Sequence, residues 1–430
     1  MSRNLGTRVV RNPSHDFTHF PPPTAQPPHL VVALNEYGQD RIFIRLYGPA
    51  VETSPYGDPS AILDVRPRTV QLQGARLRRR WKAEFVDAQP LTPEGLPVRG
   101  RPERPYATQV DLTGEPEDEL LPVLEELAAQ GAYLLFKVLL AGPDQRTSQV
   151  RRVLTDLLSR KDLRIRFDSD TLFLPWPLLC LPEHETPDGG LDAVFRRFLG
   201  YRHQIEQTGG YYPELPTTQS PAPPPVSPSV SLNHDTRVDA AGWTKASEVA
   251  AVLARNTTYR ERCTHQDLVN DIAAGKVDEQ FMYFWCHGWF QTEDADSPFF
   301  AVQLSDGRDI DAQTVLARCS ADAGTPLSRN PLVLLNACYA GVPGSAGLAH
   351  LGGALIQVGA AGVLGPQIEM PQVFAAEYAL LYVTRYLTGE ETAGVIARDL
   401  ARHFADKHRN PLGLAYALHC GMNSRLERGL

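Results

Sequence analysis

Two short apolar runs stand out from the alternation of hydrophobic and polar positions along the chain. They are Phe281–Phe290 and Pro331–Gly341. Continuous apolar segments of about four to eight residues, rich in aromatic and branched side chains, are typical of buried strands in a parallel sheet. The first run carries His287 and the second carries Cys338. We predict that both residues emerge at the same edge of one sheet, because sites in open α/β sheets lie at the carboxyl ends of the strands.

Around these runs, strand-like and helix-like patterns alternate. Such alternation indicates an α/β fold with a mostly parallel sheet and helices on both faces. A hairpin is expected around Asp306 and Gly307. The predicted strands are 163–167, 171–174, 229–232, 299–304, 308–310 and 361–364, and the predicted helices are 117–129, 133–140, 148–158, 246–254, 311–319, 348–358, 373–387, 392–404 and 411–426.

Residues 29–110 have a different pattern, and we predict a small β-rich domain there. Its strand-like runs, 30–34, 41–47 and 69–72, are bounded by Gly, Pro and Asp. The basic run Arg76–Lys82 lies in this part. It is either a site for an anionic partner or the solvated face of a surface strand, with Leu77 and Trp81 turned inward. The acidic character of the chain favours the second interpretation.

Composition narrows the class of protein. The 430 residues are 43% hydrophobic and 21% charged, which is typical of a globular protein of two or three domains. A net charge of −8 argues against direct nucleic-acid binding. The six cysteines are scattered, as expected for free thiols in a reducing cytoplasm. Neither a signal peptide nor a membrane span is evident, so we predict a cytoplasmic location and no membrane partner.

The residue types at the ends of the two runs suit nucleophilic catalysis. A thiolate is the nucleophile, and a nearby imidazole helps to ionise it and later protonates the leaving amine. Gly288 lets the backbone approach a reacting carbonyl, so its N–H and that of Cys338 can form an oxyanion hole. Taken singly, His287 and Cys338 would each more often be core residues; their pairing favours catalysis.

Three further residues are candidates for binding a metal or the substrate. Cys286 adjoins His287, but neighbouring strand residues point to opposite faces, so Cys286 is expected in the core. No metal and no cofactor are predicted. Asn336 either lines a substrate pocket or stabilises the end of the strand. Glu369 is a candidate for a pocket that holds a basic side chain before the scissile bond.

The ordered set of motifs resembles the CHAT domain, the caspase-like peptidase module of prokaryotes. Cys338 follows His287 by 51 residues, and spacing of about 50 is the caspase arrangement. Leu163–Leu179 resembles the family's strand, turn and Pro-Trp-Glu signature, with Pro177 in place of the Glu. The two reactive runs and Gly347–Gly365 resemble its later motifs. Residues 365–370 depart from the family pattern of Trp and an acidic residue.

The resemblance implies a caspase-hemoglobinase fold and a Cys–His dyad at Cys338 and His287. The expected function is a cysteine endopeptidase that cleaves a protein partner, gated by a partner or ligand through the N-terminal domain and linked to antiviral defence or signalling. The alternative is a catalytically silent scaffold with the same fold. The expected organisation is a disordered Pro-rich segment at 1–28, the β-rich domain at 29–110, a degenerate caspase-like half at 115–208, a linker at 209–228 and an active half at 229–430.

Overall fold

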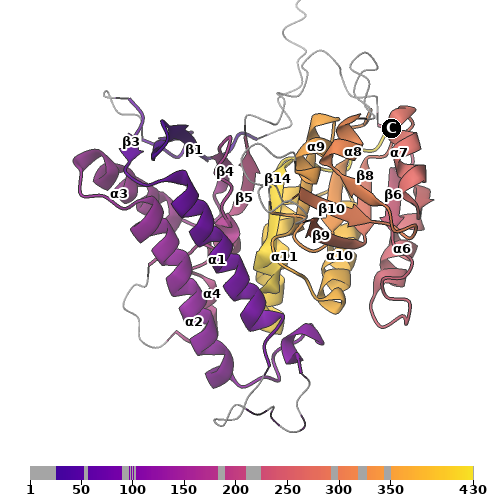
Figure 1. Ribbon diagram of the computed structural model, residues 1–430, viewed down its shortest axis with the longest axis horizontal. Helices are drawn as coiled ribbons and strands as arrows, with labels where there is room; N and C mark the ends of the chain where they lie inside the picture. The colour runs from indigo at the N-terminus through magenta and orange to yellow at the C-terminus, as the bar shows by residue number, and fades with distance from the viewer. Residues whose placement is uncertain are drawn as a thin grey trace, which may run out of the picture.

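The chain folds around an 11-stranded sheet with helices on both faces (Figure 1). The computed structural model describes residues 26–52, 57–89, 96, 98, 100, 103–182, 189–209, 224–291, 299–317, 327–342 and 350–429. The predicted α/β fold class is confirmed. In order across the sheet, the strands are β3 (Ser60–Leu63), β2 (Arg41–Tyr47), β1 (Leu30–Tyr37), β4 (Arg164–Asp168), β5 (Gln204–Thr208), β14 (Tyr416–Cys420), β13 (Gly362–Pro366), β12 (Leu332–Asn336), β8 (Phe281–Trp285), β6 (Ser229–His234) and β7 (Thr258–Arg262).

Most neighbouring strands of the sheet run parallel. Within the described residues, the antiparallel neighbours are β3 with β2, β2 with β1, and β14 with β13. Strands β8, β12 and β13 are buried at every position. Parallel strands that are covered on both faces read as continuous apolar runs, which is why the local pattern of β8 and β12 was sufficient to predict them.

Two hydrophobic clusters lie on the two faces of the sheet. Phe281, Tyr283 and Trp285 of β8 belong to one cluster, and Met282 and Phe284 belong to the other. The first face is covered by α6 (Ala246–Ala254), α10 (Gln372–Tyr386) and α11 (Ala393–His408), and the second by α7 (His265–Ala273), α8 (Ala312–Ala317) and α9 (Leu351–Gln357).

The chain leaves the main sheet directly after β8. Cys286 separates β8 from β9 (His287–Gln291), which pairs with β10 (Phe299–Gln303) in a small antiparallel sheet. The predicted hairpin is present, because β10 pairs with β11 (Asp309–Asp311). The apolar run Phe281–Phe290 is therefore two strands in two sheets, with His287 at the start of the second.

The β-rich N-terminal part extends the main sheet, because β1 pairs in parallel with β4. The predicted strand at 69–72 is wrong: these residues lie in helix α1 (Pro67–Phe85). Val70, Gly74, Leu77, Trp81 and Phe85 are buried in α1, and their spacing of three or four residues is that of one helix face. The basic run Arg76–Lys82 is thus on a helix, although Leu77 and Trp81 do point inward.

The predicted helix at 411–426 is also wrong. A short 3-10 turn, η5 (Pro411–Ala415), leads into strand β14. β14 fills the space between β5 and β13 and pairs with both. This pairing is a tertiary effect that overrides the local helical preference of Tyr416–Cys420.

The helices of the first half were largely predicted. The predicted strand at 171–174 is irregular backbone that leads into the 3-10 turn η4 (Trp176–Leu178), where Pro175 and Pro177 lack backbone N–H donors. Most of the predicted disordered segment 1–28 and linker 209–228 lies outside the described residues. The other helical elements are η2 (Pro105–Ala107), α2 (Glu117–Tyr133), the π-helical turn η3 (Leu134–Leu139), α3 (Gln145–Ser159), α4 (Gly190–Phe195) and α5 (Leu199–Arg202).

Candidate functional site

His287 and Cys338 follow neighbouring parallel strands at equivalent positions. The last paired residues of the β8–β12 ladder are Trp285 and Asn336. His287 lies two residues beyond Trp285, and Cys338 lies two residues beyond Asn336. Both residues therefore leave the sheet at the same carboxyl edge.

A tight turn holds the backbone of Cys338. Tyr339, the next residue, has a φ of +63°, which is uncommon for a residue with a side chain. Its N–H donates to the carbonyl of Ile368 at 3.2 Å, and the N–H of Gly341 donates to the carbonyl of Pro366 at 2.8 Å. The turn is thus fixed to the segment that follows β13.

Gly288 brings the start of β9 against this turn. A Cβ atom at position 288 would lie 2.6 Å from the carbonyl oxygen of Cys338, 2.9 Å from Phe300 and 3.0 Å from the Cβ of Ala337. Real Cβ atoms essentially never approach other atoms that closely. The absence of a side chain at Gly288 therefore lets the His287 segment contact the backbone of Cys338.

The thiol of Cys338 is half-buried, and burial raises its pKa above the ordinary value. The backbone N–H of Met370 donates a hydrogen bond to the sulfur and opposes this shift. Glu369 raises the pKa of the thiol, and the ammonium of Lys82 lowers it. The thiol is therefore mostly protonated at neutral pH and needs a base to become a nucleophile.

The imidazole of His287 is exposed at the sheet edge. Within the described residues, no hydrogen bond joins it to Cys338; a nucleophile and its base often close to bonding distance only when substrate binds.

Asp235 lies close to His287. It follows β6, is buried, and its N–H donates to the carbonyl of Trp285 at 3.0 Å. Burial acts to raise the pKa of Asp235, but hydrogen bonds from Arg237, together with the charge of His287, outweigh burial and lower it. This carboxylate is not among the predicted site residues, because the predicted strand ends at residue 232.

Asn336 is buried and makes its hydrogen bonds within the protein. Its amide nitrogen donates to the carbonyl of Ala375 at 2.9 Å, and its oxygen accepts a 2.8 Å hydrogen bond from the hydroxyl of Tyr416. These partners tie β12 to α10 and β14. They favour the second of the two predicted roles, in which Asn336 stabilises the end of the strand.

Glu369 lies beside the nucleophile and faces a cation from the N-terminal part. Its carboxylate forms a 3.1 Å ion pair with Lys82 of α1, and the same ammonium lies 2.6 Å from Asp87. The hydrogen bond with Asp87 is the main cause that raises the pKa of Lys82 to about 12. No local sequence pattern connects Lys82 with the site, because 287 positions separate it from Glu369.

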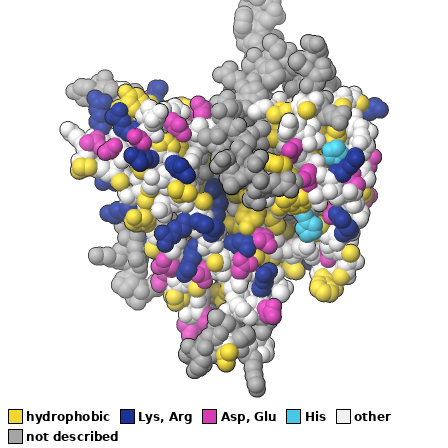
Figure 2. Space-filling model, in the orientation of Figure 1, with side chains coloured by type: hydrophobic (Ala, Val, Ile, Leu, Met, Phe, Trp, Pro, Cys, Tyr) yellow, Lys and Arg dark blue, Asp and Glu magenta, His cyan; other side chains and the backbone are white. Residues whose placement is uncertain are grey.

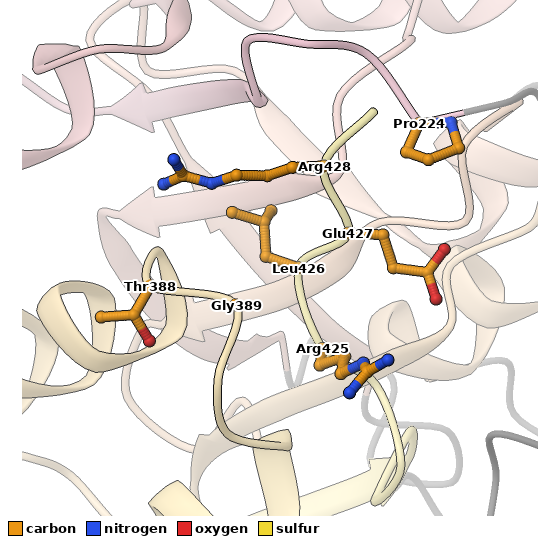
Figure 3. Close-up of a pocket in the computed structure, with 7 residues that line it drawn as sticks. All are labelled: Pro224, Thr388, Gly389, Arg425, Leu426, Glu427 and Arg428. Atoms are coloured by element: carbon orange, nitrogen blue, oxygen red, sulfur yellow. The ribbon is translucent and has the colours of Figure 1, made fainter. Parts of the chain in front are cut away.

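Two further features take no part in this chemistry: a buried cysteine and a pocket. Cys286 is buried in a hydrophobic cluster, as predicted. A pocket of about 370 Å³ is lined by Pro224, Thr388, Gly389 and the C-terminal residues 425–428 (Figure 3). The side chain of Gln280, which precedes β8, donates to the carbonyl of Glu427 in this segment. The pocket therefore lies at the opposite edge of the sheet from His287.

The comparison with protein families agrees with the resemblance found in the sequence. A family model described as the CHAT domain matches residues 132–410. No curated protein matches the chain. Two structures of the Saccharomyces cerevisiae separase–securin complex, at 3.0 and 2.6 Å resolution, are similar: each is 8% identical, with a TM-score of 0.47, and the match covers 91% of this chain and 30% of that chain. Within the described residues, every helix is too short or too polar to cross a membrane.

Proposed function

We propose that this chain, which belongs to the CHAT domain family and has its caspase-like fold, is a cysteine endopeptidase that cleaves a protein partner. Cys338 would be the nucleophile and His287 the base. One observation carries this proposal. The register of β8 and β12 sends both residues out at one sheet edge, and Gly288 contacts the carbonyl of Cys338. Acyl transfer requires a nucleophile with a base within reach, and two adjacent strand ends can supply both.

The proposed reaction begins with the thiol of Cys338. As its sulfur attacks the scissile carbonyl, the imidazole of His287 accepts the thiol proton. The N–H groups of Gly288 and Cys338 donate to the oxyanion that forms. His287 then protonates the leaving amine, and water hydrolyses the thioester by the same route. The raised pKa of Cys338 fits a mechanism in which the proton leaves during attack.

The test is cleavage of a peptide library by the purified chain and by matched variants. We expect Cys338→Ala and His287→Ala to abolish cleavage, and Cys338→Ala to abolish labelling by a thiol-reactive peptide probe. Cys420→Ser is the matched control, because Cys420 is also only partly buried but lies opposite Gly362 at the start of β13, at the other end of the strands from Cys338; it should cleave normally. Equal cleavage by wild type and Cys338→Ala would refute the assignment.

The substrate-facing role of Glu369 is also proposed. A carboxylate beside the nucleophile suits a Lys or Arg side chain of the substrate, but Lys82 now occupies it. The N-terminal part would thereby gate the site, and a partner or ligand that displaces α1 would free Glu369. Figure 2 shows Lys and Arg side chains gathered where Figure 1 draws α1, which fits an acidic activating partner. A role in bacterial antiviral defence or signalling is part of the same proposal.

The gate cannot be tested by removing residues 1–110. β1 pairs with β4 of the main sheet, and Trp81 of α1 is fully buried against Phe198. The truncated chain would expose that core and the edge of β4. Substitution of Lys82 alone leaves the core intact and tests the gate directly.

A second candidate function is a catalytically silent scaffold. One observation favours it: Pro177 replaces the family's glutamate and is buried in η4. In that case Cys338→Ala would keep its full biological activity in cells, whereas the endopeptidase proposal expects that activity to disappear.

A further inference from the structure

Three side chains with metal-binding atoms meet at the edge of the sheet, on β6 and β7. His234 is the last residue of β6, Glu261 lies in β7, and Cys263 follows β7 directly. Leu232 pairs with Glu261 in this parallel ladder. Strand residues two apart share a face, so His234, Glu261 and Cys263 project from the same side of the sheet.

The three atoms form a compact triangle. Nε2 of His234 lies 2.7 Å from Oε1 of Glu261 and 3.2 Å from Sγ of Cys263, and Sγ lies 3.8 Å from Oε1. Both neighbours approach the same ring nitrogen. A neutral imidazole nitrogen carries either one hydrogen or one lone pair, so it can serve only one of these neighbours fully, and the thiol of Cys263 reaches Oε1 only over the long distance of 3.8 Å. A cation at the centre of the triangle would satisfy all three.

We propose that His234, Glu261 and Cys263 bind a zinc-class divalent ion. Ligand distances of roughly 2.0–2.3 Å to a tetrahedral ion place ligand atoms about 3.3–3.8 Å apart. The Sγ–Oε1 distance already has that value, and the other two need to widen by less than about 1 Å. Imidazole and thiolate ligands select Zn²⁺ and similar metals over Mg²⁺ and Ca²⁺.

The surroundings leave the site accessible. The side chains of His234 and Glu261 are 17% and 48% exposed, so an ion can enter and keep a water in its fourth position. Arg262, the basic residue between two of the ligands, turns to the other face and pairs with Glu279 at 2.7 Å and Asp271 at 2.8 Å. Its charge is therefore already compensated by carboxylates.

The ion would join the edge strand to the strand beside it. β7 lies at the end of the sheet and pairs only with β6 in the described part of the chain. A metal bridge from His234 to Glu261 and Cys263 would hold the carboxyl ends of these two strands together. The proposal does not depend on peptidase activity.

No sequence motif indicates this site. Glu261 and Cys263 lie 27 and 29 positions after His234, whereas zinc motifs usually pair ligands a few residues apart. Only the pairing of β6 with β7 brings them together.

The test is metal binding by the full-length chain. The purified protein is incubated with Zn²⁺, freed of excess ion and analysed for bound metal; Co²⁺ is then used as a spectroscopic probe, because a cobalt–thiolate bond gives a charge-transfer band. We expect about one ion per chain, a thiolate band, and a melting temperature that rises with zinc concentration.

Variants assign the ligands. His234→Ala and Cys263→Ser should weaken binding by at least about 100-fold, since loss of even an outer-shell partner costs about 10- to 100-fold. Glu261→Gln keeps its shape at an exposed position and should weaken binding while the fold is retained. Cys420→Ser on β14 is the matched cysteine control and should bind normally. The proposal is overturned if wild type retains no ion, if the thiolate band survives in Cys263→Ser, or if His287→Ala rather than His234→Ala removes the metal.

Discussion

The contact between Gly288 and Cys338 makes Gly288→Ala the most direct test of the site geometry. The new methyl group would lie 2.6 Å from the carbonyl oxygen of Cys338, whereas ordinary contacts begin at 3.4 Å. The neighbouring Phe300 ring can rotate, but a backbone carbonyl in a fixed turn cannot. The start of β9 and the Cys338 turn must therefore separate by several tenths of an ångström.

Two magnitudes follow from that displacement. Overpacking of a well-packed region costs about 1–3 kcal/mol of stability. A catalytic group misplaced by about 1 Å costs on the order of 100-fold in rate, so the smaller shift expected here should lower kcat/KM by roughly 10- to 100-fold. Secondary structure should be unchanged, because Gly288 lies at the beginning of a short strand.

The assay combines urea unfolding with cleavage and with the rate of probe labelling at Cys338. Gly114→Ala is the matched control: a Cβ atom there would meet nothing within 4 Å, so its stability should change by no more than about 0.5 kcal/mol. If Gly288→Ala cleaves and labels at the wild-type rate, the close approach of β9 has no part in catalysis.

Three further outcomes are expected. Because burial raises the pKa of Cys338, its alkylation by iodoacetamide should keep accelerating beyond the pH at which a free thiol is half ionised; a plateau near neutral pH would contradict this. Lys82→Met should free Glu369 for the substrate. Since a half-exposed ion pair contributes about 0.2–1 kcal/mol, kcat/KM for peptides with Lys or Arg before the cut should rise by roughly 1.4- to 5-fold. An equal gain for Gln-containing peptides would argue against competition for Glu369. Burial lowers the pKa of His203 to about 4, while the unfolded chain binds that proton near pH 6.5, so stability should fall as pH drops through this window. Urea unfolding at pH 7 and at pH 4.5 measures this loss in the free energy of unfolding. The loss should be smaller in His203→Asn than in the wild type by up to about 3 kcal/mol. An equal loss in both proteins would show that other groups dominate.

The sequence predicted those parts of the fold that local pattern determines. β8 and β12 are buried on both faces, so their apolar runs were sufficient. The residue types at 69–72 favour a strand, yet the spacing of Val70 with Trp81 and Phe85 is that of a helix face. Tyr416–Cys420 became a strand only because β5 and β13 leave a space that it fills.

Missed site features have the same cause. Lys82 and Glu369 form an ion pair across 287 positions, and no short pattern links them. Strand β5 was not predicted for a similar reason: its residue Glu206 is polar yet buried, because it pairs with Arg166 at 2.8 Å and accepts from the N–H of Met422. Partners contributed by distant segments cannot be read from a local window.

The position of β14 determines when the main sheet can be completed during synthesis of the chain. This strand, Tyr416–Cys420, lies between β5 and β13 and so joins the strands of the first half to those that carry the site. Until residue 420 has left the ribosome, β5 and β13 each present an unpaired edge, and unpaired edges invite association with other chains. A nascent chain that already displays His287 and Cys338 consequently still has an incomplete sheet, and premature termination before residue 416 would leave an aggregation-prone fragment.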